Sequence, residues 1–128
     1  MTVQALTAEE FDRTISDSDI VVVDFWAPWC GPCLGFAPVF EQVADENADI
    51  TFAKVNTDEE QALSAHFRVR SIPTLMVFRE QVLVFEQAGA LPKGALTDLL
   101  SQVRNLDMAE IRRGAVPYDA GDEAGQAQ

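Results

Sequence analysis

Cys30 and Cys33 are the only cysteines in the chain, and their spacing indicates thiol-disulfide chemistry. In the first turn of a helix, residues three apart lie about 5–6 Å from each other, which suits a disulfide. Because only two residues separate the cysteines, the small ring that they close would add little to the stability of the fold. The pair therefore indicates a reversible redox centre and not a structural cross-link.

The position of the pair at the start of a predicted helix gives the two sulfurs different roles. The free N–H groups and the dipole at a helix N-terminus stabilise a thiolate and lower its pKa. We therefore expect Cys30 to be the exposed attacking sulfur and Cys33, one turn further in, to be the buried resolving thiol. The alternative, half of a structural zinc site, would need four ligands, and the chain has no second cysteine pair and one histidine, His66. We expect no metal.

Asp24 interrupts the apolar run 20–26, which otherwise has the composition of a strand buried on both faces. Burial of a carboxylate costs several kcal/mol and raises its pKa toward neutrality. The functional interpretation is a general base that takes the proton of Cys33; the alternative is an aspartate that reaches water near the end of the strand. Lys54, in the predicted strand 51–56, either faces the same interior or extends to the surface.

The segment Ile72-Pro73-Thr74 precedes a predicted strand. A proline at this position either marks the edge of a sheet or forms a cis peptide bond, and the sequence leaves both interpretations open.

The remaining pattern predicts strands that alternate with helices. Strands are expected at 3–6, 20–26, 51–56, 74–78 and 82–86, and helices after Thr7, over 30–47, over 57–67 and from about 92. Capping boxes are expected at 7–10 and 57–60, and the last two strands form a hairpin that lacks glycine. This order predicts an α/β fold with helices on both faces of the sheet. We expect one domain over 1–113, with an extended last helix, followed by a disordered acidic and small-residue tail over 114–128.

The composition of the chain excludes some classes of binding partner. The chain has 128 residues and 48% hydrophobic residues, and 9 Lys+Arg against 21 Asp+Glu give a net charge of −12. Such a surface repels nucleic acid and anionic membranes, so neither is expected as a partner. No apolar run approaches the ~20 residues that span a bilayer, and the start lacks the basic and apolar regions of a secretory signal. We expect a cytoplasmic monomer.

On these residues the chain resembles the thioredoxin family over roughly residues 3–103. The resemblance depends on the segments 23–33, 37–38, 53–56, 72–75 and 89–90, and most of all on Trp29-Cys30-Gly31-Pro32-Cys33 with Asp24 upstream. It implies the thioredoxin fold, a central mixed sheet with a parallel βαβ half and an antiparallel ββα half, flanked by helices. It also implies a protein-disulfide reductase, a thiol-disulfide oxidoreductase that carries electrons to maintain cell redox homeostasis.

The resemblance implies roles for the residues of the site. Cys30 corresponds to the nucleophile that attacks a client disulfide, Cys33 to the thiol that resolves the mixed disulfide, and Asp24 to the buried acid.

It also implies a set of tuning and docking residues around the cysteines. Gly31 and Pro32 correspond to the dipeptide that helps to set the redox potential, and Trp29 would flank the sulfur. Pro73 matches a cis-proline that lies against the cysteine pair, and Ile72 would present backbone groups to an extended client segment.

Two departures concern partner choice. Leu34 stands where the family commonly has lysine, and Ser71 where many relatives have glycine. The resemblance implies re-reduction by thioredoxin reductase. The chain has no nucleotide-binding glycine motif of its own, so we expect its electrons to come from a partner, and we expect no bound cofactor. The alternatives are a disulfide oxidase or isomerase, and a thioredoxin-fold binding module.

Overall fold

The apolar run 20–26 forms β2, the central strand of a five-stranded sheet in the computed structural model, which describes residues 2–114. The elements are β1 (Val3–Ala5), α1 (Ala8–Asp17), β2 (Ile20–Trp26), α2 (Gly31–Glu46), β3 (Thr51–Asn56), α3 (Gln61–His66), β4 (Thr74–Arg79), β5 (Val82–Ala88), α4 (Lys93–Arg104) and α5 (Met108–Gly114). The strand order is β1-β3-β2-β4-β5. The strands β1, β3 and β2 pair in parallel, and β4 and β5 continue the sheet antiparallel. The expected fold class is confirmed.

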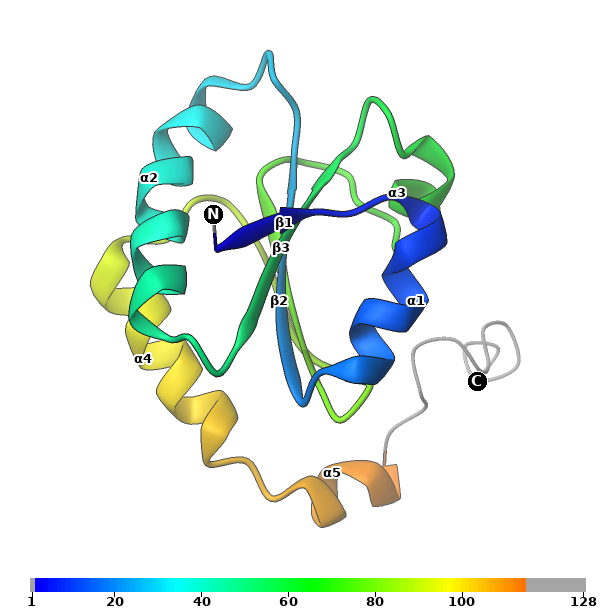
Figure 1. Ribbon diagram of the computed structural model, residues 1–128, viewed down its shortest axis with the longest axis vertical. Helices are drawn as coiled ribbons and strands as arrows, with labels where there is room; N and C mark the ends of the chain where they lie inside the picture. The colour runs from blue at the N-terminus through cyan, green and yellow to red at the C-terminus, as the bar shows by residue number, and fades with distance from the viewer. Residues whose placement is uncertain (1, 115–128) are drawn as a thin grey trace.

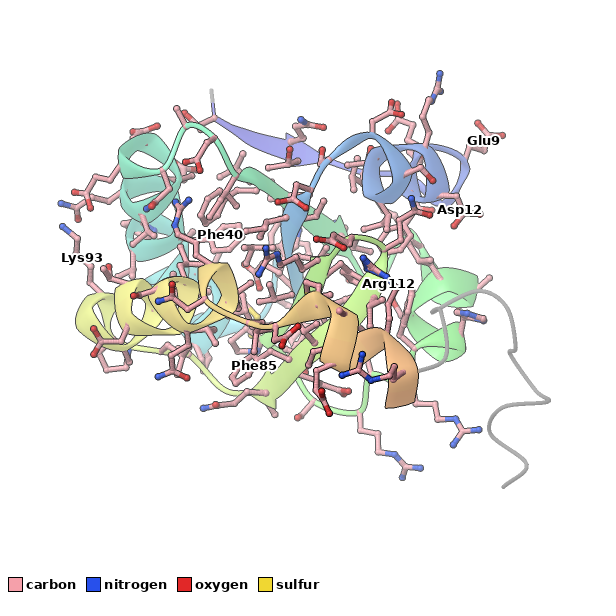
Figure 2. All side chains as sticks on the ribbon, turned by 90° about the horizontal axis from the view of Figure 1, so that it is seen from below. Glu9, Asp12, Phe40, Phe85, Lys93 and Arg112 are labelled. Carbon is pink, nitrogen blue, oxygen red and sulfur yellow. A yellow bond between two sulfur atoms is a disulfide. The ribbon has the colours of Figure 1, made fainter. Side chains whose placement is uncertain are left out.

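Helices lie on both faces of the sheet (Figure 1), and a hydrophobic layer fills the space between the sheet and the helices on each side. Successive side chains of a strand point to opposite faces, so the even-numbered residues of β2 face one layer and the odd-numbered residues face the other. The first layer includes Val22 and side chains of α2 and α4, among them Phe40, which points into the interior in Figure 2. The second includes Val23 and side chains of α1. Asp24 therefore lies on the face that α2 and α4 cover.

Only one of the two expected capping boxes forms. Thr7 is the N-cap of α1, and its N–H donates to Glu10 Oε1 at 3.3 Å. The box expected at 57–60 is wrong, because α3 begins only at Gln61. There Asn56 Oδ1 accepts the Asp58 N–H at 2.9 Å in a tight turn. Such a local side-chain bond offers the backbone an alternative to the helix, which delays the start of α3.

The hairpin without glycine is confirmed, and its turn has an unusual backbone. The turn residues Glu80 and Gln81 have φ angles of 52° and 70°, in the left-handed region. Two residues of positive φ match the right-handed twist of the strands that they join, although glycine or asparagine usually takes such positions.

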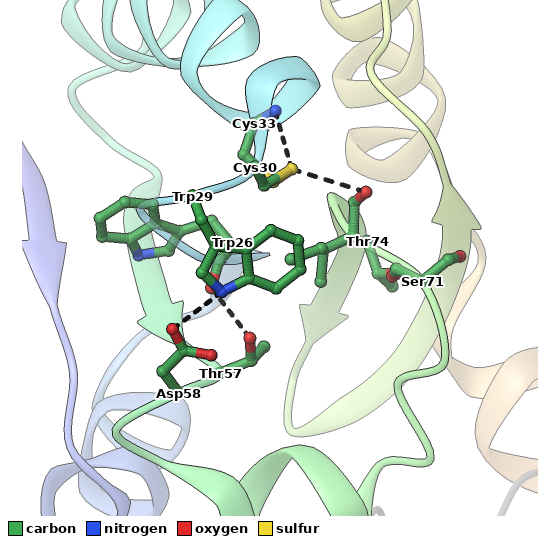
Figure 3. Close-up of a disulfide and its surroundings, with 9 residues drawn as sticks. Trp26, Trp29, Cys30, Cys33, Thr57, Asp58, Ser71 and Thr74 are labelled. Carbon is green, nitrogen blue, oxygen red and sulfur yellow. Dashed lines mark hydrogen bonds between the residues drawn. A yellow bond between two sulfur atoms is a disulfide. The ribbon is translucent and has the colours of Figure 1, made fainter.

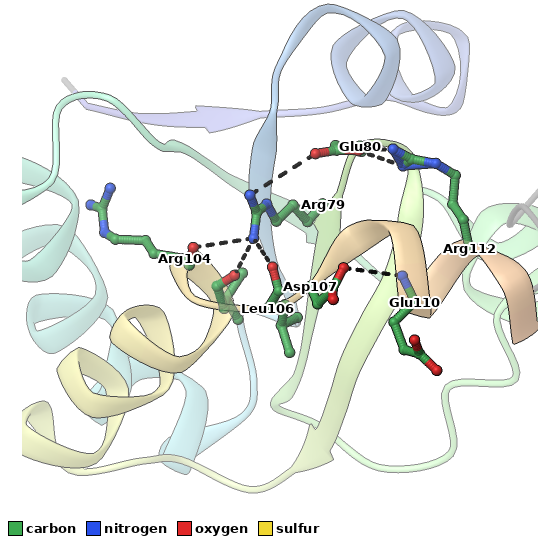
Figure 4. A network of polar contacts seen from close by, with 8 residues as sticks. Arg79, Glu80, Arg104, Leu106, Asp107, Glu110 and Arg112 are labelled. Carbon is green, nitrogen blue, oxygen red and sulfur yellow. Dashed lines mark hydrogen bonds and ion pairs between the residues drawn. The ribbon is translucent and has the colours of Figure 1, made fainter.

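The last helix does not extend as expected, since α4 ends at Arg104 and α5 is a separate helix. The cause is Arg79, whose Nη1 donates to three backbone carbonyls at the end of α4, those of Val103, Arg104 and Leu106, at 2.8, 3.2 and 3.1 Å (Figure 4). The side chain thus satisfies carbonyls that have no partner within a terminated helix.

A new helix starts directly afterwards, where Asp107 Oδ1 accepts the Glu110 N–H at 3.2 Å. Arg112 of α5 then pairs with Glu80 of the hairpin turn (Figure 4). Gly114, expected as the first residue of the tail, is the last residue of α5, and the rest of the predicted tail lies outside the described residues.

Candidate redox-active site

Cys30 and Cys33 form a disulfide where β2 gives way to α2 (Figure 3), with their Cα atoms 5.2 Å apart. Cys30 is the N-cap of α2, and Cys33 lies in the first turn. Because β2 is the central strand, the disulfide sits at the middle of one edge of the sheet, where loops from neighbouring strands meet.

The backbone around Cys30 Sγ favours a negative charge on that atom. The Cys33 N–H donates to Cys30 Sγ at 3.1 Å, and the first turn of α2 contains no acidic residue. A helix N-terminus and a hydrogen bond to sulfur both stabilise a thiolate. Once the disulfide is reduced, this arrangement favours ionisation of Cys30.

The expectation that Cys30 is exposed is wrong for this disulfide state. Cys30 is 4% exposed and Cys33 is 2% exposed. The two cysteines and Ala27 form a small cluster, against which the half-buried Trp26 and Ile72 pack. Contacts from other elements therefore cover the first sulfur, and its place at a helix N-terminus could not reveal them.

The loop before β4 lies beside the disulfide. The Ile72–Pro73 peptide bond is cis, which decides between the two interpretations of the sequence, and Ile72 O lies 3.8 Å from Cys30 Sγ. The Gly89 N–H donates to Pro73 O at 2.7 Å. Gly89 has a φ of +102°, a backbone conformation that favours glycine. The end of β5 thereby holds the cis-proline loop in place.

Asp24 lies on the face of the sheet that α2 and α4 cover, and only 4% of its surface is exposed. The alternative, an aspartate that reaches water near the end of the strand, is therefore wrong. Within the described residues its Oδ1 has no hydrogen-bonding partner. Burial raises the pKa of Asp24 to about 7, although the Lys54 ammonium lowers it. Lys54 is the register partner of Asp24 on β3, and its Nζ lies 4.9 Å from the centroid of the Trp26 ring.

Trp29 is 69% exposed, and its indole N–H donates to Asp58 Oδ2 at 2.9 Å (Figure 3). Gly31 and Pro32 are exposed in the first turn of α2, next to it. Asp58 was not singled out from the sequence. The sequence could have indicated this contact, because Trp29 follows β2 and Asp58 follows β3, and segments that follow two paired parallel strands meet at the same edge of the sheet.

Over residues 2–114, no cluster of three or more His, Cys, Asp or Glu side chains could hold a metal ion. In the same part of the chain, no helix has the length and apolar composition needed to cross a membrane.

Comparisons with known proteins agree with this geometry. The family model described as Thioredoxin matches residues 2–102. A protein named putative thioredoxin 2 from Streptomyces coelicolor is 51% identical over 115 residues, covering 90% of this chain and 86% of its own. A thioredoxin from Haemophilus influenzae is 45% identical, over 73% of this chain and 89% of its own. The structure of a mutant thioredoxin from Halobacterium salinarum aligns with a TM-score of 0.77 at 38% identity, covering 81% of this chain and 92% of that one.

Proposed function

Since the chain belongs to the thioredoxin family of thiol-disulfide oxidoreductases and is a protein-disulfide reductase, we propose that Cys30, Cys33 and Asp24 carry out the reaction. The observation that carries the proposal is the bond from the Cys33 N–H to Cys30 Sγ at 3.1 Å, at the N-terminus of α2. It makes Cys30 the sulfur whose thiolate is stabilised, and so the nucleophile.

In the first step, the Cys30 thiolate attacks one sulfur of a client disulfide. A bond forms between Cys30 Sγ and that sulfur, the client S–S bond breaks, and the other client sulfur leaves as a thiolate that takes up a proton. The product is a mixed disulfide between the chain and its client.

In the second step, the Cys33 thiol transfers its proton to the Asp24 carboxylate and its sulfur attacks Cys30 Sγ. The bond between Cys30 and the client breaks, the second client sulfur leaves as a thiolate that takes up a proton from solvent, and the Cys30–Cys33 disulfide seen in the structure forms. Two electrons have passed to the client, and Asp24 returns its proton to solvent. A pKa of about 7 suits a base that must accept and release a proton near neutral pH.

The residues beside the disulfide receive the client. Ile72, adjacent to the cis peptide bond at Pro73, presents its backbone to an extended client segment, in the manner of an added strand. The exposed Trp29 covers one side of that segment, and Gly31 and Pro32 tune the redox potential of the pair.

Members of this family are in general re-reduced by thioredoxin reductase, and they act on disulfide-containing clients. For this chain we extend the proposal to re-reduction by an NADPH-dependent thioredoxin reductase, to a monomer and to the cytoplasm.

Two serine variants test the proposal. Cys30→Ser should abolish insulin reduction, because no nucleophile remains. Cys33→Ser should instead accumulate mixed disulfides with clients, detectable by non-reducing electrophoresis and mass spectrometry. Reduction of insulin by Cys30→Ser at the wild-type rate would refute the assignment.

A further inference from the structure

The turn that joins α3 to β4 is basic in an otherwise acidic chain. It contains Arg68 and Arg70, and the sequence has no aspartate or glutamate over 61–79, although the whole chain has 21 acidic residues. Both arginines are exposed, whereas Val69 between them packs against the hydrophobic layer beneath α1. Among residues 2–114, neither arginine forms an ion pair. Two exposed guanidinium groups in this turn are therefore available to a partner.

The backbone of Arg68 raises the free energy of the folded state. Arg68 follows Phe67, the C-cap of α3, and its φ of 57° lies in the left-handed region. The Arg68 N–H donates to Ala65 O and the Val69 N–H to Ser64 O, both at 3.0 Å, which are the two bonds of a Schellman motif. Glycine usually takes this position, because a Cβ atom is strained there. Since the helix could end at lower cost without an arginine, the strain points to a function of the side chain.

The two arginines directly precede the loop that lies against the disulfide. Ser71 and Ile72 follow them, and Ile72 O lies 3.8 Å from Cys30 Sγ (Figure 3). Because a residue spans at most about 3.6 Å, the Cα atom of Arg70 lies within about 7 Å of that of Ile72, and the Cα atom of Arg68 within about 14 Å. An extended client segment aligned with the Ile72 backbone covers the same distance with the residues two to four positions from its cysteine.

We propose that Arg68 and Arg70 form a carboxylate-binding site, which favours clients with aspartate or glutamate two to four positions from the reactive cysteine. The inference rests on the proposed function, because it concerns which disulfide clients that site accepts. The planar guanidinium group matches a carboxylate with two parallel hydrogen bonds. Asp58, at the same edge of the sheet, does not compete, because it accepts the Trp29 indole N–H. The net charge of −12 repels an acidic client elsewhere, so this turn also orients the client.

Single-turnover reduction of synthetic peptides tests the proposal without a reductase. The pre-reduced protein is mixed with one of two short cyclic disulfide peptides, which carry either glutamate or glutamine two and four positions outside each cysteine. For each protein variant, the second-order rate constant with the glutamate peptide is divided by the rate constant with the glutamine peptide. Comparison of this ratio between variants cancels the intrinsic reactivity of each peptide and that of the Cys30 thiolate.

Replacement of both arginines by glutamine should lower this ratio about fourfold, and each single replacement about twofold, because one exposed ion pair contributes a factor of about two. The decrease should disappear in about 0.5 M NaCl, since salt screens exposed charges. Arg113→Gln is the matched control, because it removes one exposed positive charge from α5, at the end of the sheet opposite the disulfide (Figure 1). This control should leave the ratio unchanged.

Arg68→Gly separates the role of the charge from a structural role. Glycine adopts the left-handed backbone without strain, so this variant should unfold at a higher urea concentration than the wild-type protein. It should nevertheless lose the same factor of about two in the rate ratio as Arg68→Gln. A stabilised Arg68→Gly with the wild-type ratio would show that the Arg68 side chain does not bind the client.

The outcomes separate this inference from the proposed function. An unchanged ratio in the double variant, or an equal decrease in Arg113→Gln, would overturn the carboxylate-binding site while disulfide reduction itself still stood. A reduced wild-type protein that reacts with neither peptide would instead refute the proposed function.

Discussion

Replacement of Asp24 by asparagine should stabilise the oxidised protein, by an amount that depends on pH. Burial raises the pKa of Asp24 from an ordinary 3.8 to about 7. One pKa step corresponds to about 1.4 kcal/mol, so the ionised carboxylate lowers the free energy of unfolding by roughly 4 kcal/mol above pH 7. Because Asp24 is 4% exposed, solvent screens little of this penalty.

The sign follows from the protons bound in each state. Below pH 3.8 the carboxyl is protonated in the folded and the unfolded chain, so Asp24 and asparagine should give similar stability. Between about pH 4 and pH 7 the unfolded state loses this proton while the folded state retains it, and the wild-type protein loses stability. The advantage of Asp24→Asn should therefore grow over this range and then remain constant at roughly 4 kcal/mol.

Urea unfolding of the oxidised proteins at pH 4, 5.5, 7 and 8.5 measures this difference. Asp98→Asn is the matched control, because it removes a carboxylate from an exposed position on α4. A constant difference between Asp24→Asn and wild type across the four pH values would refute the burial argument, and so would a less stable variant at pH 8.5.

Three other measurements test separate parts of the structure. The rate at which Cys33 resolves a mixed disulfide should rise as pH passes about 7, where Asp24 ionises; stopped-flow measurements should show this rise in the wild-type protein, and its persistence in Asp24→Asn would exclude Asp24 as the base. Gln81→Gly should stabilise the fold by about 1 kcal/mol in urea unfolding, because glycine adopts a φ of 70° without strain; a destabilised variant would contradict strain in the turn. Arg79→Met should destabilise the protein by about 2 kcal/mol, because the Val103, Arg104 and Leu106 carbonyls lose a charged donor. Thermal unfolding at the wild-type temperature would show that these bonds contribute nothing.

The sequence allowed prediction of those parts of the fold that depend on local pattern. The apolar run interrupted by Asp24 was sufficient to predict a strand buried on both faces, since this follows from hydrophobicity along one segment; it left open whether the carboxyl is buried or reaches water. The capping box at Thr7 has the same origin, because N-cap preferences are local. The order of strands and helices then predicted a sheet with helices on both faces, as observed, but it did not predict the strand order β1-β3-β2-β4-β5.

The wrong expectation at 57–60 has a local cause, the Asn56–Asp58 bond, but the other features that the sequence did not predict depend on contacts between segments far apart in the chain. The end of α4 is set by Arg79, 24 positions before the Val103 carbonyl that it binds. Part of the cover over Cys30 comes from Ile72, on another loop. The Trp29–Asp58 bond joins residues 29 positions apart, and only the pairing of parallel strands could have indicated it. Residue preferences within a short window contain no information about such partners.

The position of α5 makes it a suitable place to attach a label without covering the disulfide. The disulfide follows the C-terminal end of β2, and α5 lies near the other end of the sheet (Figure 1). Arg79 pairs with Ile20 at the N-terminal end of β2, and its side chain binds the Leu106 carbonyl just before α5. A seven-residue strand spans roughly 20 Å. A dye or a surface linkage placed on the exposed Arg113 side chain of α5 is therefore attached at the end of the sheet opposite the disulfide, and it leaves the client-facing edge unobstructed.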